Sequence, residues 1–245
     1  MKPRAVCGLA LLLPLMAFPP AAAAGTGSLA IRGVRIFDGT RVLPAGTVIV
    51  ENGTIRTIGT SPPIPEGAEI VDGTGMTLLP GLIDAHTHVF GPALRTAVMH
   101  GVTTELDMFT AHFMAAMMRS EQAAGGATDR ADLFSAGTLV TAPGGHGTEY
   151  GMAIPTIERP EEAQAFVDAR IAEGSDYIKI VYDDGRAYGK SIPTLSKETM
   201  AAVIAAAHRR GKLAVVHIGT RLRRLRVSRL DANAVEELGN DRHQS

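Results

Sequence analysis

The feature that most constrains the fold is an alternation, between residues 81 and 218, of short apolar runs with loops and helical patterns. The apolar runs predict strands at 82–86, 102–108, 176–182 and 213–218, with one more inside 132–141. Strands that alternate with helices pair in parallel, because each helix returns the chain to the same edge of the sheet. The pattern therefore predicts an α/β fold of about five βα units, fewer than the eight of a closed barrel.

Helical patterns at 92–100, 110–124, 159–173 and 196–210 separate these strands. Ser196 has the side chain of an N-cap for the last of these helices, and Gly211 is expected to end it.

Residues 28–80 have a different pattern, made of short β-like runs without helices. Expected strands lie at 29–36, 47–51, 54–60, 69–71 and 76–79. Asn52-Gly53 separates the second strand from the third, and this dipeptide favours the positive φ angles of a two-residue hairpin turn. The segment is predicted to be part of a small β-sandwich with no chemistry of its own.

Residues 1–24 have the pattern of a secretory signal peptide. Basic residues precede an apolar stretch, and small residues at 21–24 offer a cleavage site. An uncleaved membrane anchor is the alternative, but Pro14 interrupts the stretch that would have to span. We expect cleavage near Ala23 or Ala24, no stable membrane anchor, and a periplasmic or secreted protein.

Composition limits the classes of function. With 45% hydrophobic residues and a formal net charge of −1, the chain can bury a core but offers no positive excess to nucleic acid. Its single cysteine, Cys7, lies in the predicted signal peptide. The mature protein is therefore expected to lack disulfides and cysteine-rich zinc sites, and any metal must be held by His, Asp, Glu or a less ordinary ligand.

Candidate metal ligands lie where the first parallel strand ends, in PGLIDAHTH at residues 80–88. Side chains alternate along a strand, so His86 and His88 face the same side and can reach one metal ion. A His-x-His pair also occurs by chance, but catalytic groups of (β/α)₈ enzymes gather at the carboxyl ends of strands. The position therefore favours metal binding.

Lys179 and His217 occupy the fourth and fifth strands. Lys179 lies in an apolar run, where burial of an ammonium is costly and lowers its pKa. A neutral amine there can be a nucleophile, or can take up carbon dioxide to become a carbamate that bridges two cations; the alternative is a lysine at the strand tip that reaches solvent. His217 ends its strand, and taken alone it is more typical of a core histidine. The convergence of both with the two histidines of the first strand favours one shared site.

With these residues the sequence resembles the amidohydrolase superfamily, particularly its imidazolonepropionase-like and Xaa-Pro dipeptidase-like branch. The resemblance covers residues 28–219 and implies part of a β-sandwich followed by an incomplete (β/α)₈ TIM-like barrel at 81–219. It implies that His86 and His88 bind one divalent metal ion and that a carboxylated Lys179 bridges to a second ion held by His217. Zinc is the commonest metal in such families. The implied reaction is hydrolysis of a C–N bond in an amide, cyclic amide or dipeptide by a metal-bound hydroxide.

The resemblance also implies contacts with this small-molecule substrate. The loop at 144–151 is similar to a loop of the same branch, so His146 and Tyr150 are expected to contact the amide or dipeptide, with a flexible surface loop as the alternative. Tyr182, at the end of the fourth strand, is a further candidate for the pocket wall. A tyrosine that caps the sheet is the alternative there.

The sequence departs from the superfamily pattern after residue 219. That pattern needs a histidine on a sixth strand and an aspartate on an eighth, and the Arg-rich tail at 220–245 offers only His243, in a polar terminus. The tail is interpreted either as a solvated helix or as the mark of a C-terminal truncation, which we favour. The alternative function is therefore an inactive fragment of such an enzyme, whose exposed fifth strand could pair with a second copy of the chain.

Overall fold

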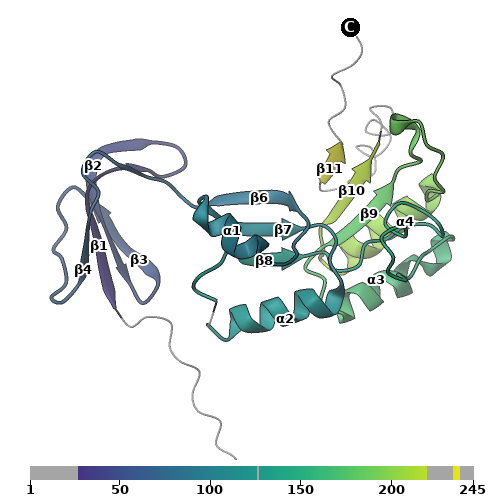
Figure 1. The fold of residues 1–245 in the computed structure, drawn as a ribbon, viewed down its shortest axis with the longest axis horizontal. Helices are drawn as coiled ribbons and strands as arrows, with labels where there is room; N and C mark the ends of the chain where they lie inside the picture. The colour runs from purple at the N-terminus through teal and green to yellow at the C-terminus, as the bar shows by residue number, and fades with distance from the viewer. Residues whose placement is uncertain (1–26, 126, 220–233, 238–245) are drawn as a thin grey trace, which may run out of the picture.

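A computed structural model describes residues 27–125, 127–219 and 234–237, the last of these by their backbone. Figure 1 shows an N-terminal β-sheet to one side of a succession of parallel strands and their helices. Within the described residues, no helix combines the length and apolar character needed to cross a membrane. The predicted signal peptide lies outside the described residues.

The N-terminal part is one five-stranded sheet. Its strands are β1 (Ser28–Phe37), β2 (Val42–Glu51), β3 (Thr54–Gly59), β4 (Glu69–Asp72) and β5 (Thr77–Leu78). The order is β3-β2-β1-β4, with β5 also paired to β1; β2 runs antiparallel to β1 and β3, whereas β4 and β5 run parallel to β1.

The predicted hairpin turn is confirmed. Asn52 has a φ of 51° and Gly53 a φ of 73°, the two positive angles that a type I′ turn requires. This turn joins β2 to β3 and sets their antiparallel register.

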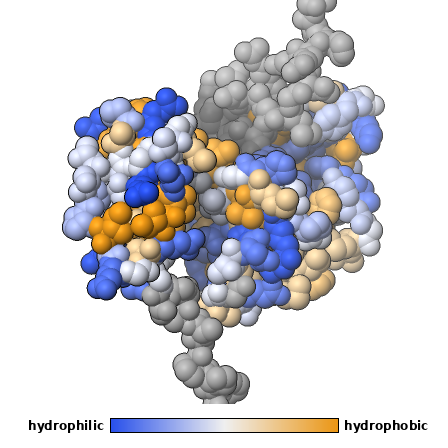
Figure 2. Space-filling model, turned by 60° about the vertical axis from the view of Figure 1, so that its left-hand side comes forward, coloured by the Kyte–Doolittle hydropathy of each residue, from blue (hydrophilic) through white to orange (hydrophobic). Residues whose placement is uncertain are grey.

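The N-terminal sheet buries one small apolar cluster and leaves other aliphatic side chains in solvent. Val34, Ile36 and Val48 form the buried cluster. Figure 2 shows apolar side chains gathered on this part of the surface, and the exposed apolar residues of its strands are Val42, Ile55, Ile58, Ile70 and Val71. A sheet has two faces, and a single sheet cannot by itself bury the apolar side chains on both of them.

The second part repeats the strand–helix order that the sequence predicts. Its first half contains β6 (Leu82–Thr87), α1 (Ala93–Met99), β7 (Val102–Asp107), α2 (His112–Ala123) and β8 (Asp132–Ser135). Its second half contains the short 3₁₀ turn η1 (Pro160–Glu162), α3 (Ala163–Ala172), β9 (Ile178–Tyr182), a second turn η2 (Arg186–Tyr188), α4 (Lys197–Arg209) and β10 (Ala214–Ile218). All five predicted strands and all four predicted helices of this part are therefore present.

The strands follow one another in chain order. β6, β7 and β8 form one parallel sheet, and β9 and β10 belong to a second. Val140 joins the two sheets by a parallel bridge to Ile180, with hydrogen bonds from its amide to Lys179 O and from the Val181 amide to its carbonyl, both of 2.8 Å. The arrangement is an open section of a parallel α/β barrel.

The Arg-rich tail, in which the sequence pattern predicts no further parallel strand, contains one. β11 (Ala234–Glu237) pairs in parallel with β10, opposite residues 215–218. The expectation failed because four residues, two of them acidic, are too few to show a strand pattern. β10 is consequently paired on both sides, and the fifth strand is not an exposed edge. The rest of the predicted tail, His243 included, lies outside the described residues.

Alternation along β9 and β10 separates two environments. Ile178 and Ile180 on β9, with Val216 on β10, belong to the main core, which includes Val167 of α3 and Met200, Val203 and Ile204 of α4. Side chains of the other parity, among them Val215 and Tyr177, pack in a smaller cluster on the opposite face. Lys179 and His217 share the parity of this opposite face, away from the helices.

The predicted N-cap of α4 is present in the structure, and its contribution to stability can be tested. The Ser196 hydroxyl accepts a 2.9 Å hydrogen bond from the Thr199 amide. We expect Ser196→Ala to lower the free energy of unfolding by about 1 kcal/mol, because an amide at the helix start loses its acceptor. Ser196→Asp, which keeps an acceptor, should retain most of that stability in urea titrations. Equal losses in both variants would contradict the capping role.

Candidate active site

His86 and His88 lie together at the carboxyl end of β6. Their ring centroids are 5.6 Å apart in an edge-to-face arrangement. The Asp84 carboxylate accepts a 3.0 Å hydrogen bond from the His86 amide, and the Met108 amide donates to Thr87 O at 2.9 Å. The backbone at and between the two histidines is therefore held by polar contacts.

Lys179 and His217 lie on one face of the neighbouring strands β9 and β10. Lys179 is opposite Val215 and His217 is opposite Val181, so the two side chains are diagonal neighbours. Lys179 is 3% exposed and His217 is 5% exposed. The alternative of a lysine that reaches solvent from the strand tip is therefore wrong.

Charge effects connect the two pairs. Burial lowers the pKa of Lys179 to about 7. Burial, and then the positive charge of Lys179, lower the pKa of His86 to about 4, and the same two causes lower that of His217 to about 4. The charge of the amine thus acts on a histidine of β6 and on one of β10, and all three groups are shifted toward their neutral forms.

A neutral imidazole suits a divalent cation, because a ring nitrogen without a proton can donate its lone pair; His217 is buried, whereas His86 and His88 are exposed. The Nε2 atom of His217 is buried and has no hydrogen bond within the described residues; it lies 3.5 Å from Asp183 Oδ2. No group of three or more His, Cys, Asp or Glu side chains in the described chain is arranged to hold a metal ion. The donor set therefore fits a cation only if Lys179 supplies a ligand as well.

The loop after β8 brings His146 to this group. Its ring centroid lies 5.3 Å from that of His217 and 6.0 Å from that of Tyr150. Glu149 accepts a 2.5 Å hydrogen bond from His146 Nδ1. Gly145 allows the loop to pack here, because a Cβ at this position would lie 2.5 Å from the Thr141 hydroxyl. His146 is thus placed beside His217, and Tyr150 lies next to His146.

Tyr182 is placed elsewhere, and its predicted substrate contact is corrected. It is 5% exposed and belongs to the main core with the residues of α4. Tyr182 is three positions from Lys179, so alternation turns it to the other face of β9. The alternative, a tyrosine that packs at the end of the sheet, agrees with the structure.

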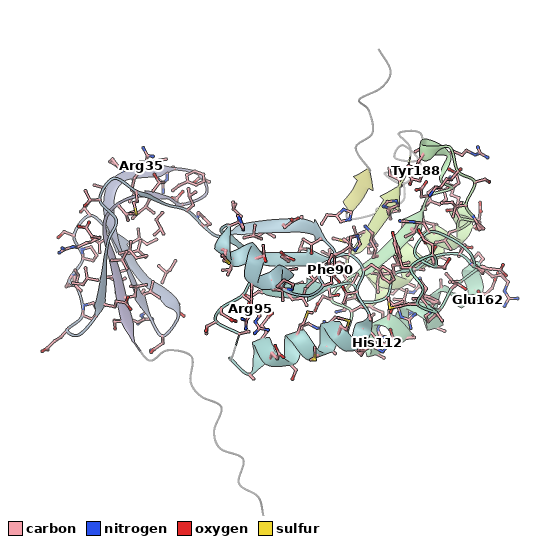
Figure 3. The ribbon with its side chains drawn as sticks, in the orientation of Figure 1. Arg35, Phe90, Arg95, His112, Glu162 and Tyr188 are labelled. Atoms are coloured by element: carbon pink, nitrogen blue, oxygen red, sulfur yellow. The ribbon has the colours of Figure 1, made fainter. Side chains whose placement is uncertain are left out.

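Sequence reasoning missed three carboxylates around the site: Asp107, Glu149 and Asp183. Asp183 is fully buried directly after β9 and accepts hydrogen bonds from the Gly185 amide, at 3.0 Å, and from the Tyr188 hydroxyl. Figure 3 shows Tyr188 beyond the end of β9 and Phe90 beyond the ends of β6 to β8. Asp107 and Asp183 could have been found from their positions, because each stands at or just after the carboxyl end of a predicted strand.

Known proteins resemble this chain in sequence and in structure. Dihydroorotase of Mycobacterium tuberculosis (strain ATCC 25618 / H37Rv) is 46% identical over 66 residues, which are 26% of this chain and 14% of the dihydroorotase. A putative prolidase from Bifidobacterium longum superposes with a TM-score of 0.71 and 26% identity, over 86% of this chain and 54% of the prolidase. A Xaa-Pro dipeptidase crystallised with bound methionine gives a TM-score of 0.70 at 22% identity, over 85% of this chain and 61% of the dipeptidase.

No family model matches the sequence. The chain covers about half the length of the prolidase and a smaller share of the dihydroorotase. The structural likeness nevertheless extends over most of the present chain, and prolidases, dipeptidases and dihydroorotases share one superfamily. In its fold, a β-sheet followed by successive parallel βα units, and in its similarity to these proteins, this chain resembles the amidohydrolase superfamily.

Proposed function

We propose that the protein is a metal-dependent hydrolase of C–N bonds in a small amide, cyclic amide or dipeptide. The observation that supports this proposal is the buried pair of Lys179 and His217 on neighbouring strands, with the charge of Lys179 acting both on His217 and on His86, which lies beside His88. The similarity to prolidase and dihydroorotase supports the type of bond.

His86 and His88 would hold one cation, His217 a second, and Lys179 both. Lys179 can do so only as a carbamate: its neutral amine nitrogen bonds to the carbon of CO₂ and one proton is released, which leaves an anion with two oxygens. Burial favours the neutral amine that this reaction needs. Divalent ions, with zinc as the expected metal, would polarise a substrate carbonyl and acidify water in such a site.

The protein's own residues would hold the substrate beside these ligands. The carboxylate of Glu149 accepts from His146 Nδ1, and this contact fixes the orientation of the imidazole. His146 Nε2 then remains for a polar group of the substrate. Tyr150, whose ring centroid lies 6.1 Å from that of Phe109, adds an aromatic wall for an apolar group.

Replacement of Lys179 tests the metal site. We expect Lys179→Ala to abolish binding of two zinc ions per chain, with partial rescue by acetate or propionate, because a short carboxylate can occupy the space of the carbamate. Lys179→Met should lose zinc without a loss of stability, since an apolar side chain suits the buried strand. Zinc content measured by mass spectrometry, with Lys197→Ala on the surface of α4 as the control, provides the test. Unchanged zinc content in both Lys179 variants would contradict the bridging role.

Hydrolysis is tested with the zinc-loaded full chain and a panel of Xaa-Pro dipeptides, N-acyl amino acids and cyclic amides. Release of a free amine should occur with at least one member and should be lost in Lys179→Met. Tight zinc binding without hydrolysis of any member would contradict the proposed reaction and favour the inactive alternative.

We also propose export, on the sequence pattern of residues 1–24. Expression with the complete N-terminus in a Gram-negative host should yield a periplasmic protein that begins near Gly25, as N-terminal sequencing would show. A cytoplasmic protein that retains Met1 would contradict this proposal.

A further inference from the structure

Asp107 is a fully buried carboxylate beside the loop that carries His88. It ends β7, and three donors converge on its two oxygens. Oδ1 accepts from the Val89 amide at 3.0 Å and from the Thr110 hydroxyl at 2.8 Å. Oδ2 accepts from the Ser135 hydroxyl at 2.5 Å. The amide of the residue that follows His88 is therefore bonded to a side chain of the next strand.

The backbone around Asp107 ties the same loop to the rest of the barrel. The Tyr177 hydroxyl and the Ala136 amide donate to Asp107 O at 2.7 Å and 2.9 Å. The Met108 amide donates to Thr87 O, as described above. Asp107 thus stands at the point where the ends of β6, β7 and β8 and the start of β9 are joined.

An aspartate carboxylate suits this place because it offers acceptors alone. An asparagine of the same size would replace one of these oxygens by an NH₂ group that cannot accept, so at least one of the three donors would lose its present acceptor. The Thr110 hydroxyl also lies 3.1 Å from Val89 O, so it connects Asp107 to both polar atoms of the Val89 backbone. The loop after His88 is consequently held at both the amide and the carbonyl of Val89.

We propose that Asp107 is a positioning residue: it holds the imidazole of His88 in place beside His86 for metal binding. This inference rests on the proposed metal site. Groups that orient metal ligands from outside the first coordination sphere commonly change metal affinity by about 10- to 100-fold when they are removed.

The first test measures the dissociation constant of Zn²⁺ for the full chain and for Asp107→Asn. We expect binding to weaken by about 10- to 100-fold in the variant. Thr199→Val is the matched control: it removes a buried 2.8 Å hydrogen bond to Glu158 O near the start of α4 and should lower stability without a change in zinc affinity. Wild-type zinc affinity in Asp107→Asn, or an equal weakening in Thr199→Val, would overturn the proposal.

A second pair of variants covers the case in which Asp107→Asn does not fold. Thr110→Val removes the hydroxyl that connects Asp107 to Val89 but keeps the carboxylate, and should weaken zinc binding to a smaller extent. Thr110→Ser restores the hydroxyl and should restore the affinity. Equal affinities in Thr110→Val and Thr110→Ser would overturn the positioning role.

A readout without metal separates this inference from the proposed function. In NMR spectra of the metal-free chain, Thr110→Val should shift the ring signals of His88 and leave those of His208 on α4 in place. Absence of zinc binding in the wild type, together with this shift, would defeat the proposed metal site but retain the positioning role. Unshifted His88 signals would overturn the positioning role even if the wild type binds zinc.

Discussion

The burial of Lys179 is the constraint on which the candidate site depends. An amine that is 3% exposed inside a parallel strand cannot keep its charge at low cost, and burial lowers its pKa to about 7. The lysine has the parity of the face away from the helices, next to His217 and within the electrostatic reach of His86. A buried base in this position lowers stability, and the carbamate proposed above would account for its presence.

Parallel topology brings these residues together from distant parts of the sequence. Each strand from β6 to β10 runs in the same direction, so the carboxyl ends and the loops that follow them meet at one edge. The loop after β8 adds His146, and buried carboxylates at the ends of β7 and β9 fix the loops that follow β6 and β9. The scaffold thus supplies both the imidazoles and the acceptors that orient the surrounding loops.

Much of this arrangement could be predicted from the sequence, because it depends on local patterns. The strand and helix periods from β6 to β10, the Asn52-Gly53 turn and the cap at Ser196 each have a signal within a few residues. The pairing of β11 could not be predicted, since four residues give no period. The placement of Tyr182 follows from alternation along β9, which turns it to the face opposite Lys179, whereas its position at the end of the strand does not by itself distinguish the two faces.

The polar contacts of the site were harder to predict for a different reason. The bond from Glu149 to His146 lies within one loop, whose conformation depends on close packing at Gly145 rather than on a residue pattern. The bonds of Asp107 reach residues 18 and 28 positions away. Long-range contacts of this kind follow from tertiary packing, which no local period encodes.

The junction at Val140 divides the candidate ligands into two groups. His86 and His88 belong to the sheet of β6 to β8, whereas Lys179 and His217 belong to the sheet of β9 and β10. A cation shared between these groups would act as a mechanical clamp across the junction. Its binding free energy would then oppose any shearing of one sheet past the other, and chelation would loosen the molecule along this line first.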